Sequence, residues 1–281
     1  PVPAYDDARG PPTSNAPHSG YQRVEAALSL IAADTGKPPP FRVSQDAHAG
    51  ALSFEFSHAR HRIIVNCGMP GINKKAWQRV ARATAAHSTA TPNDTSSCRF
   101  LIETPSSRFT GTPIVAGPRE VRVARTERDG VHSIRASHDG YARNYGVVHQ
   151  RSWLLSIDGT RLDGEDAFLA ASPRRKSRRG EDEFALRFHL HPSVKASRLA
   201  DSATVMLVLP RQQGWLFSAP GREVRLEESV FLSTSDTPRR TSQIVVYGKV
   251  REGERIVWHL VRTEAAPAEK RATASVPELP L

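Results

Sequence analysis

The stretch ALSFEFSHARHRIIVNCG, residues 51–68, contains two runs of alternating apolar and polar side chains with a short polar break between them. In the first run Leu52, Phe54 and Phe56 alternate with polar residues, and the second run, HRIIVNCG, is rich in β-branched residues. A period of two is typical of strands with one buried face, because successive side chains of a strand point to opposite faces. This stretch therefore predicts two strands joined by a turn.

The same pattern recurs along most of the chain. Further short runs are CRFLIE, REVRVARTE, VHSIRAS, SWLLSIDG, FALRFHLH, ATVMLVLP, QGWLFSA, REVRLEES, QIVVYGKV and RIVWHLVR, most of them separated by Gly, Pro, Asp or Ser. About a dozen short strands with turns between them predict an all-β fold, a large antiparallel β-sandwich of jelly-roll-like form with little helix. Residues 74–86 are the main helix candidate, whereas residues 24–34 suit a helix almost as well as a strand.

We expect a single domain over residues 21–262. Residues 1–20 are polar and proline-rich and lack the apolar core of a signal peptide, so they are interpreted as a linker from a missing N-terminal region. Residues 263–281 show no apolar periodicity and are expected to be disordered. No apolar run approaches the roughly 20 residues that a membrane helix needs, so no membrane span is expected.

The chain is basic, with 39 Lys and Arg against 29 Asp and Glu and a formal net charge of +10. Such a balance suits nucleic acid, anionic lipid or an acidic polysaccharide. Much of the charge lies in SPRRKSRRG, residues 172–180, and a short run of this kind is more often a solvated loop than a binding site. Since no helix-turn-helix, zinc-finger spacing or aromatic ribonucleoprotein motif accompanies it, nucleic acid is not expected as a partner.

The two cysteines, Cys67 and Cys98, lie in or beside apolar runs and form no CxxC pair. Two cysteines do not make a disulfide framework, so buried free thiols are expected, although the sequence leaves one disulfide open. The cysteines therefore leave the cellular compartment open.

Histidine is the main source of candidate chemistry, because the chain has 11 histidines and no nucleophile elbow, phosphate loop or HExxH motif. RFHLHP predicts a strand with Arg187, His189 and His191 on one face and Phe188 and Leu190 on the other. The first three could bind a metal or hold the carboxylate of a substrate. A solvated polar face is the alternative interpretation.

The segment SHDGYARNYGVVHQR is also rich in polar and titratable side chains. Asp139 and Gly140 predict a turn, in which the carboxylate bonds to the backbone and the glycine takes a positive φ. Tyr141 and His149 would be able to move a proton or contact a substrate if this loop faces a cleft.

Taken together, DAHAGALSFEFSHARHRIIVNCG and ARATAAHSTATPNDTSS resemble the heparinase II/III family of polysaccharide lyases. The family signature is roughly His-x-His-x-Asp before Leu-Ser-Phe, then a strand ending in Asp-x-Gly, then an Ala-His-Asn-Thr turn. Here residues 52–54, the VNCG strand end and residues 86–89 hold the corresponding places. The likeness runs from SGYQR near the start to VWHLVR near the end. It implies the C-terminal β-sandwich of proteins that also carry an N-terminal α/α toroid, and a location in the periplasm or cell envelope, although the residues themselves leave the cytoplasm open.

The resemblance also assigns candidate roles. His48, Asn66 and His87 stand where some family members bind zinc, with Asn66 in place of an aspartate. Asp46 stands where the family has a catalytic histidine, and Gly50 replaces an aspartate. A neutral amide is a poorer zinc ligand than a carboxylate, so weak or no zinc binding is expected. The resemblance therefore implies a lyase site that has lost some of its groups.

Two functions follow. The first is the C-terminal domain of a lyase that cleaves an acidic, uronate-containing polysaccharide by elimination when joined to its toroid. The isolated chain would then be inactive, because the base, the proton donor and the groups that neutralise the carboxylate converge from both domains. The second is a noncatalytic carbohydrate-binding or structural β-sandwich with a decayed site.

Overall fold

The computed structural model describes residues 14–16, 18–71, 75–102, 111–128, 131–172, 182–232 and 237–263. The expected tail beyond Thr263 and the basic run beyond Ser172 lie outside these residues. Thr263 itself ends the last strand, and two residues of the expected linker form the short first strand.

Two large sheets make up most of the described residues. The first sheet contains β1 (Asn15–Ala16), β2 (Tyr21–Ala26), β3 (Ser29–Asp34), β4 (Phe54–His58), β5 (His61–Val65), β6 (Ala90–Pro92), β13 (Glu183–Leu190), β17 (Val224–Phe231) and β18 (Arg239–Lys249). The second contains β9 (Val121–Arg128), β10 (Val131–His138), β11 (Val147–Leu155), β12 (Arg161–Ala170), β14 (Lys195–Arg198), β15 (Thr204–Val208), β16 (Gly214–Ser218) and β19 (Glu254–Thr263). A small hairpin is formed by β7 (Arg99–Phe100) and β8 (Ile114–Ala116).

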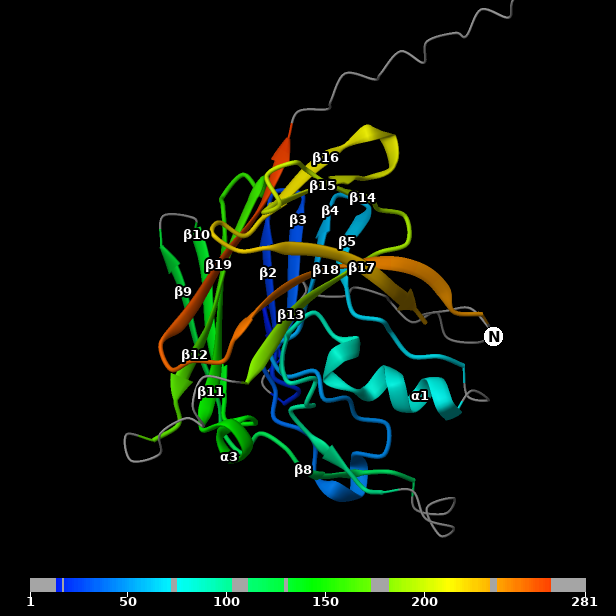
Figure 1. Ribbon diagram of the computed structural model, residues 1–281, viewed down its shortest axis with the longest axis vertical. Helices are drawn as coiled ribbons and strands as arrows, with labels where there is room; N and C mark the ends of the chain where they lie inside the picture. Colours follow the sequence, from blue (N-terminus) through cyan, green and yellow to red (C-terminus); the bar gives the residue numbers. More distant parts are fainter. Residues whose placement is uncertain are drawn as a thin grey trace, which may run out of the picture.

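The first sheet has the order β1-β2-β3-β4-β5-β13-β18-β17, with β6 beside β13, and the second has the order β14-β15-β16-β19-β12-β11-β10-β9. Within the described ranges every strand pair is antiparallel. Figure 1 shows the two sheets with little helix around them. The predicted antiparallel β-sandwich is confirmed.

Aromatic side chains from both sheets fill the space between them. Phe54 of β4 stacks on Trp258 of β19, with ring centroids 5.5 Å apart and planes 15° apart, and Phe188 of β13 meets the same tryptophan at 4.9 Å. Gly164 lies opposite Trp258 on β12, where a Cβ atom would come within 2.0 Å of the indole ring. Truncating such a buried ring to alanine costs about 3–5 kcal/mol in other proteins, so these contacts carry much of the fold's stability.

The segment with the ambiguous pattern forms a hairpin. Residues 24–34 fall in β2 and β3, whose burial alternates with a period of two, and Ala27 takes a positive φ of 49° between them. The predicted helix at 74–86 is present as α1 (Lys75–Arg82) followed by a 3₁₀ turn, η2 (Thr84–Ala86). Residues 24–34 thus form strands rather than a helix, because their alternate side chains are buried and β3 pairs with both β2 and β4.

The loop after β10 differs from its predicted turn. Asp139 does bond to backbone, accepting from the N–H groups of Arg119 and Glu120, but Gly140 has no positive φ. Glycine is needed there for space, because a Cβ atom would lie 2.9 Å from Nδ1 of His138. A short helix, α3 (Ala142–Tyr145), follows this loop.

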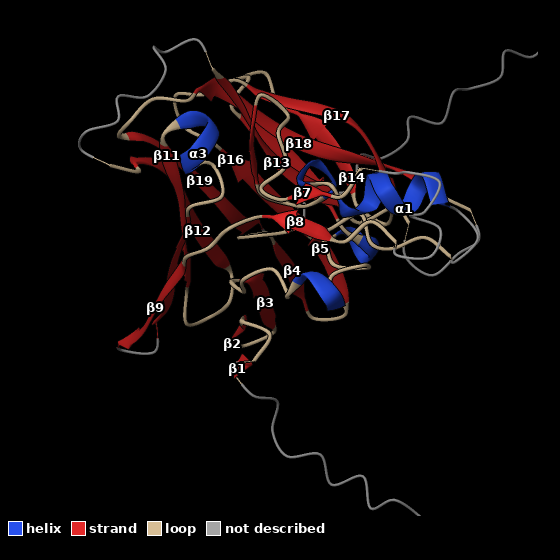
Figure 2. Cartoon of the chain, turned by 90° about the horizontal axis from the view of Figure 1, so that it is seen from below, coloured by secondary structure: helices blue, strands red, loops and turns tan. Residues whose placement is uncertain are grey.

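Helix and hairpin elements gather at one end of the sandwich. Figures 1 and 2 both place α1, the β7–β8 hairpin and α3 at this end, with another 3₁₀ turn, η1 (Phe41–Val43), beside the hairpin; a further turn, η3 (Pro210–Gln212), precedes β16. Cys67 and Cys98 are buried free thiols, as predicted. In the part of the chain that the structure describes, no helix has the length and apolarity required to cross a membrane.

Candidate functional site

The structure brings His48, Asn66 and His87 together at the helical end of the sandwich. His48 lies in the loop before β4, Asn66 directly follows β5, and His87 directly follows η2. All three line one pocket of about 370 Å³. The backbone holds these segments side by side, since the N–H of Cys67 donates to the carbonyl oxygen of Ala86 at 2.9 Å.

The two histidines form a hydrogen-bonded chain with a fixed direction. Nδ1 of His87 lies 2.8 Å from the carbonyl oxygen of Ala83, which can only accept, so this nitrogen carries the proton. Nε2 of His87 is then an acceptor, and Nδ1 of His48 donates to it at 3.0 Å. This leaves Nε2 of His48 with a lone pair and with no hydrogen-bond partner in the described parts of the chain.

Burial keeps both imidazoles neutral. Burial, together with the neighbouring His48, lowers the pKa of His87 to about 3. Burial and the Arg82 guanidinium lower the pKa of His48, while the nearby Asp46 carboxylate opposes them. A neutral His48 is therefore able to accept a proton at neutral pH.

Arg82 fixes the loop that carries His48. This side chain of α1 is buried and donates to the carbonyl oxygens of Ser44 and Ala47 at 2.9 and 2.7 Å. It also donates to the hydroxyl of Thr112 at 2.8 Å. The loop is thus tied to the helix by a charged side chain rather than by apolar packing alone.

The residues present do not fit a resident zinc ion. Asn66 is neutral, and its Oδ1 atom accepts from the Ser88 N–H at 2.9 Å. His87 has one ring nitrogen on Ala83 and the other on His48, and Asp46 is exposed. Within the described ranges no group of three or more His, Cys, Asp and Glu side chains is arranged to hold a metal ion. Weak or no zinc binding stays a prediction.

Gly50 makes room for the histidine pair. A Cβ atom at this position would lie 3.0 Å from Cδ2 and 3.3 Å from Nε2 of His87. An aspartate here would need the His87 ring to shift, so the glycine and the observed position of His87 go together.

Two further pocket residues were not singled out from sequence. Tyr21 and Asp34 face each other across the β2–β3 hairpin and line the same pocket. Burial raises the pKa of the Asp34 carboxyl to about 6, and burial together with Asp34 raises the pKa of Tyr21 to about 12. Only the strand register places these two side chains beside His48, so no local motif signals them.

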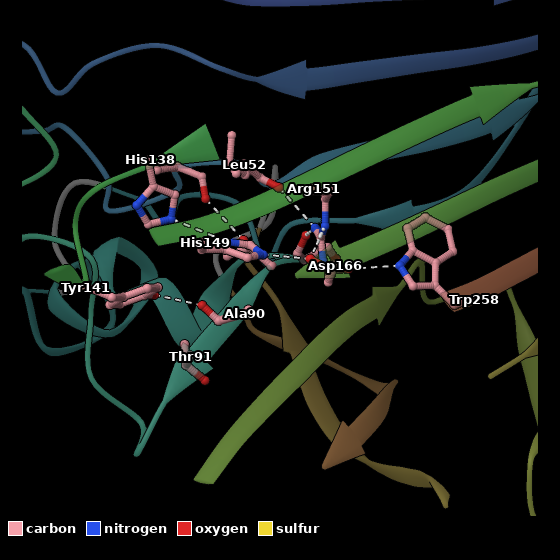
Figure 3. A network of polar contacts seen from close by, with 12 residues as sticks. Leu52, Ala90, Thr91, His138, Tyr141, His149, Arg151, Asp166 and Trp258 are labelled. Carbon is pink, nitrogen blue, oxygen red and sulfur yellow. Dashed lines mark hydrogen bonds and ion pairs between the residues drawn. The ribbon is translucent and has the colours of Figure 1, made fainter. Parts of the chain in front are cut away.

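A second polar cluster lies between the sheets, away from solvent. Figure 3 shows His149 between His138 and Asp166, with Arg151 beside the same carboxylate. His149 Nε2 donates to Asp166 at 2.6 Å, and Arg151 Nε donates to it at 2.8 Å. The indole N–H of Trp258 donates to the other carboxylate oxygen at 2.9 Å. All of these side chains are buried.

Arg151 connects this cluster to the pocket. Its terminal Nη1 donates to the carbonyl oxygens of Leu52 and Ser88, at 3.0 and 2.6 Å. Leu52 lies just after the loop that carries His48, and Ser88 is the residue after His87. The buried cation therefore holds both segments that carry the histidine pair.

Tyr141 and His149, which were predicted to contact substrate, belong to the interior. Tyr141 is 1 % exposed and donates to the carbonyl oxygen of Ala90 at 2.7 Å, and His149 is 0 % exposed. Neither side chain has a surface from which to touch a substrate, because β-sandwich packing covers both rings.

The RFHLHP strand shows the predicted alternation, but its polar face is covered. Phe188 and Leu190 enter the main core, while Arg187 pairs with Asp94 at 2.8 Å and is buried. His189 is also buried and contacts the Ser229 hydroxyl and the carbonyl oxygen of Ala85. A solvated face is thus wrong for Arg187 and His189.

The same cover weakens the case for substrate binding by this strand. Burial lowers the pKa of His189 to about 4, so this ring is neutral at ordinary pH. Of the three predicted basic side chains, His191 alone is half-buried rather than buried. The basic run at 173–180 lies outside the described residues.

Comparisons with known proteins agree with this architecture. A family model described as heparinase II/III-like, C-terminal, matches residues 8–259. The FtsZ-localized protein C of Caulobacter vibrioides is 33% identical over 267 residues, which are 93% of this chain and 45% of that protein. The chain thus spans less than half of that relative.

Solved structures show the same fold. The heparan sulfate lyase HepC from Pedobacter heparinus superposes with a TM-score of 0.66 and 13% identity, over 91% of this chain and 36% of that one. Heparinase III gives a TM-score of 0.65 and 10% identity, over 88% and 36%. Because the family model spans most of the sequence, including every residue of the histidine pocket, the chain belongs to the heparinase II/III-like C-terminal domain family.

Proposed function

We propose that this domain forms one wall of the substrate cleft of a polysaccharide lyase that cleaves an acidic, uronate-containing glycan. The observation that carries the proposal is the chain from Ala83 through His87 to His48, which leaves a neutral imidazole nitrogen without a partner at a pocket. The periplasm or cell envelope is the matching location, since such glycans lie outside the cytoplasm.

The chemistry of elimination explains why this nitrogen matters. A lyase removes the proton alpha to the uronate carboxylate, neutralises that carboxylate and protonates the leaving oxygen. His48 would accept or return a proton at Nε2, while His87 fixes the tautomer and orientation of the ring. The remaining groups would come from an N-terminal α/α toroid, and relatives that are two to three times longer have room for one.

A second candidate is a noncatalytic glycan-binding or structural domain. The observation that favours it is the loss of family groups at Asp46, Gly50 and Asn66 around an otherwise intact pocket. The relative with 33% identity is named for its localisation with FtsZ rather than for a glycan. In this case the pocket would bind a glycan, or support the fold, without turnover.

The test uses this domain joined to the proposed N-terminal toroid, incubated with heparan, alginate or a bacterial acidic exopolysaccharide. Elimination releases unsaturated uronate, which absorbs ultraviolet light. We expect His48→Gln to lower turnover at least about a hundredfold, the low end of what a positioned proton-transfer group contributes. The control is His61→Gln, since His61 lies outside the pocket lining.

The outcomes separate the two candidates. Turnover that falls in the His48 variant and not in the control supports the lyase. Glycan binding by the joined protein without turnover favours the noncatalytic domain. The isolated 281 residues are expected to show no turnover in either case. Turnover by the isolated domain, lost in His87→Ala, would contradict the need for a second wall.

A further inference from the structure

A second pocket, of about 560 Å³, adjoins the histidine pocket. Cys98 lines both pockets. The remaining wall of the second pocket comes from the β7–β8 hairpin, the loop before β9 and α3. Its volume falls in the range of about 300–1,000 Å³ that is usual for small-ligand sites.

Positive charge dominates the lining of this pocket. Arg99, Arg119 and Arg143 contribute three exposed guanidinium groups from three separate segments. Asp139 is the one acidic side chain of the lining, and its Oδ1 atom already accepts from two backbone N–H groups, at 2.8 and 3.1 Å. The three guanidinium groups outnumber the Asp139 carboxylate, which is bonded to backbone N–H groups, so the pocket is suited to an anion.

The walls of this pocket are held by close contacts at two glycines. A Cβ atom at Gly117 would lie 2.8 Å from Sγ of Cys98, and one at Gly140 would lie 3.1 Å from the carbonyl oxygen of Ser97. The contact at Gly117 holds the two ends of the hairpin together, and the contact at Gly140 packs the loop before α3 against the segment that leads into β7. The cavity is thus formed before any ligand arrives.

Hydrogen bonds also join this wall to the histidine pocket. The N–H of Ser97 donates to Oγ1 of Thr84 at 2.9 Å, and that hydroxyl donates to the carbonyl oxygen of Ala49 at 2.7 Å. Thr84 begins η2, which precedes His87, and Ala49 follows His48. The segment before Arg99 is therefore tied directly to the segments that carry both histidines.

From this arrangement we propose a second subsite, at Arg99, Arg119 and Arg143, that holds a carboxylate or sulfate of an acidic glycan bound at the histidine pocket. The inference rests on the proposed function and adds an extended substrate: one sugar unit lies at His48, while an anionic unit further along the same glycan, beyond the reach of a disaccharide, lies at the arginines. Guanidinium groups suit this task because their planar fork matches carboxylate and sulfate oxygens.

The experiment measures binding of fluorescent uronate oligosaccharides to the 281-residue chain. The probes are a disaccharide and a hexasaccharide of galacturonate, which carry carboxylates alone, and a heparin hexasaccharide, which adds sulfate. The test variant is Arg99→Gln with Arg119→Gln. The control is Arg60→Gln with Arg251→Gln, which removes the same charge from exposed positions outside both pockets. Circular dichroism confirms that both variants fold.

We expect the test variant to bind the hexasaccharides about tenfold more weakly, as two exposed ion pairs of up to about 1 kcal/mol each would produce. Its affinity for the disaccharide should stay within twofold of the original protein, and the control should stay within twofold for every probe. A larger loss with the heparin probe assigns the subsite to sulfate, and equal losses assign it to carboxylate.

Equal losses in the test and control variants would overturn the subsite, because only general charge would then matter. Stronger binding of a single-stranded oligonucleotide than of any glycan would also overturn it. If the hexasaccharide binds and only His48→Gln weakens it, the subsite fails and the proposed function stands. If no glycan binds at all, both fail.

Discussion

The molecule contains two histidine pairs of nearly the same geometry in opposite environments. His48 and His87 have ring centroids 5.1 Å apart and planes at 87°, and His138 and His149 have centroids 5.3 Å apart and planes also at 87°. The first pair ends at a pocket with an unpartnered nitrogen, whereas the second ends at the buried Asp166. The two pairs differ in what their hydrogen bonds lead to: a pocket in the first and a buried carboxylate in the second. This difference, rather than the pair itself, distinguishes a candidate site from a core network.

Charge balance explains why the buried pair is structural. Asp166 and Arg151 neutralise each other between the sheets, and His149 and Trp258 complete the carboxylate's hydrogen bonds. The guanidinium also lies 5.4 Å from the ring of Phe54 and 5.8 Å from that of Phe188. Most polar groups of this cluster therefore bond within the protein interior, and its loss would disturb both sheets and the loops above them.

The largest expected effect follows from breaking this cluster. Asp166→Asn removes the negative charge and leaves Arg151 buried without a counter-ion, which we expect to cost about 3–5 kcal/mol of unfolding free energy. The matched control is Asp163→Asn on the same strand, whose carboxylate pairs with Arg161 and His259 but is 28% exposed. The control should cost less than about 1 kcal/mol. Urea unfolding measures both, and equal costs would contradict a structural role that depends on burial.

The next effect concerns the pocket. Asn66→Asp adds a carboxylate beside His48 and His87, and we expect zinc affinity to rise about a hundredfold, at least as much as the 10- to 100-fold that outer-shell partners contribute at other sites. Atomic absorption after dialysis against a mild chelator measures retained zinc. Asn93→Asp, at an exposed position outside the pocket, is the control. Stoichiometric zinc in the unmodified protein would contradict the mismatch between these ligands and zinc.

The pH dependence of stability follows from the depressed pKa of His87. Below about pH 6.5 the unfolded chain binds a proton at this histidine, while the folded chain does not until about pH 3. Stability therefore falls as the pH drops through this window, by about 1.4 kcal/mol per pH unit for one proton. His189 acts in the same direction, and Asp34, with a raised pKa of about 6, acts in the opposite one.

Unfolding in urea at pH 7, 6 and 5 measures this slope in the unmodified protein and in His87→Gln. The variant should lose about one proton's share of the slope, whereas His61→Gln, at a partly exposed position, should not. An unchanged slope in His87→Gln would show that His87 titrates near its ordinary pKa in the folded chain.

The sequence was sufficient for the sandwich and for the grouping of His48, Asn66 and His87. Alternating side chains reveal strands directly, and a resemblance to known proteins placed the three residues together. Burial was the part that could not be predicted. His149 and His48 stand in equally polar stretches, and only Asp166 and Trp258, at distant positions on the neighbouring strands β12 and β19, distinguish them.

Pairing partners explain the other differences. Tyr21 and Asp34 meet through the register of a hairpin whose residues suited a helix almost as well. Arg187 and His189 stand on a strand face that alternation marks as polar, but η2, formed about a hundred residues earlier in the chain, covers part of it, as the contact of His189 with Ala85 shows. A local pattern reports which side chains share a face and not what later packs on that face.

The smallest expected effect compares the two glycines that stand against the two pairs. Gly50→Ala brings a methyl group to 3.0 Å from the His87 ring, which can move slightly toward the pocket, so we expect about 1 kcal/mol of destabilisation. Gly140→Ala meets the buried His138 ring at 2.9 Å and the backbone of Ser97 at 3.1 Å, and it should cost more because a backbone atom cannot rotate away as a side chain can. Urea unfolding gives both costs, and the imidazole ¹⁵N resonances of His87 report whether its hydrogen bond from His48 weakens. If Gly50→Ala leaves those resonances unchanged, or costs as much as Gly140→Ala, the pocket pair is held as rigidly as the core pair. The distinction between an adaptable site and a fixed network would then be lost.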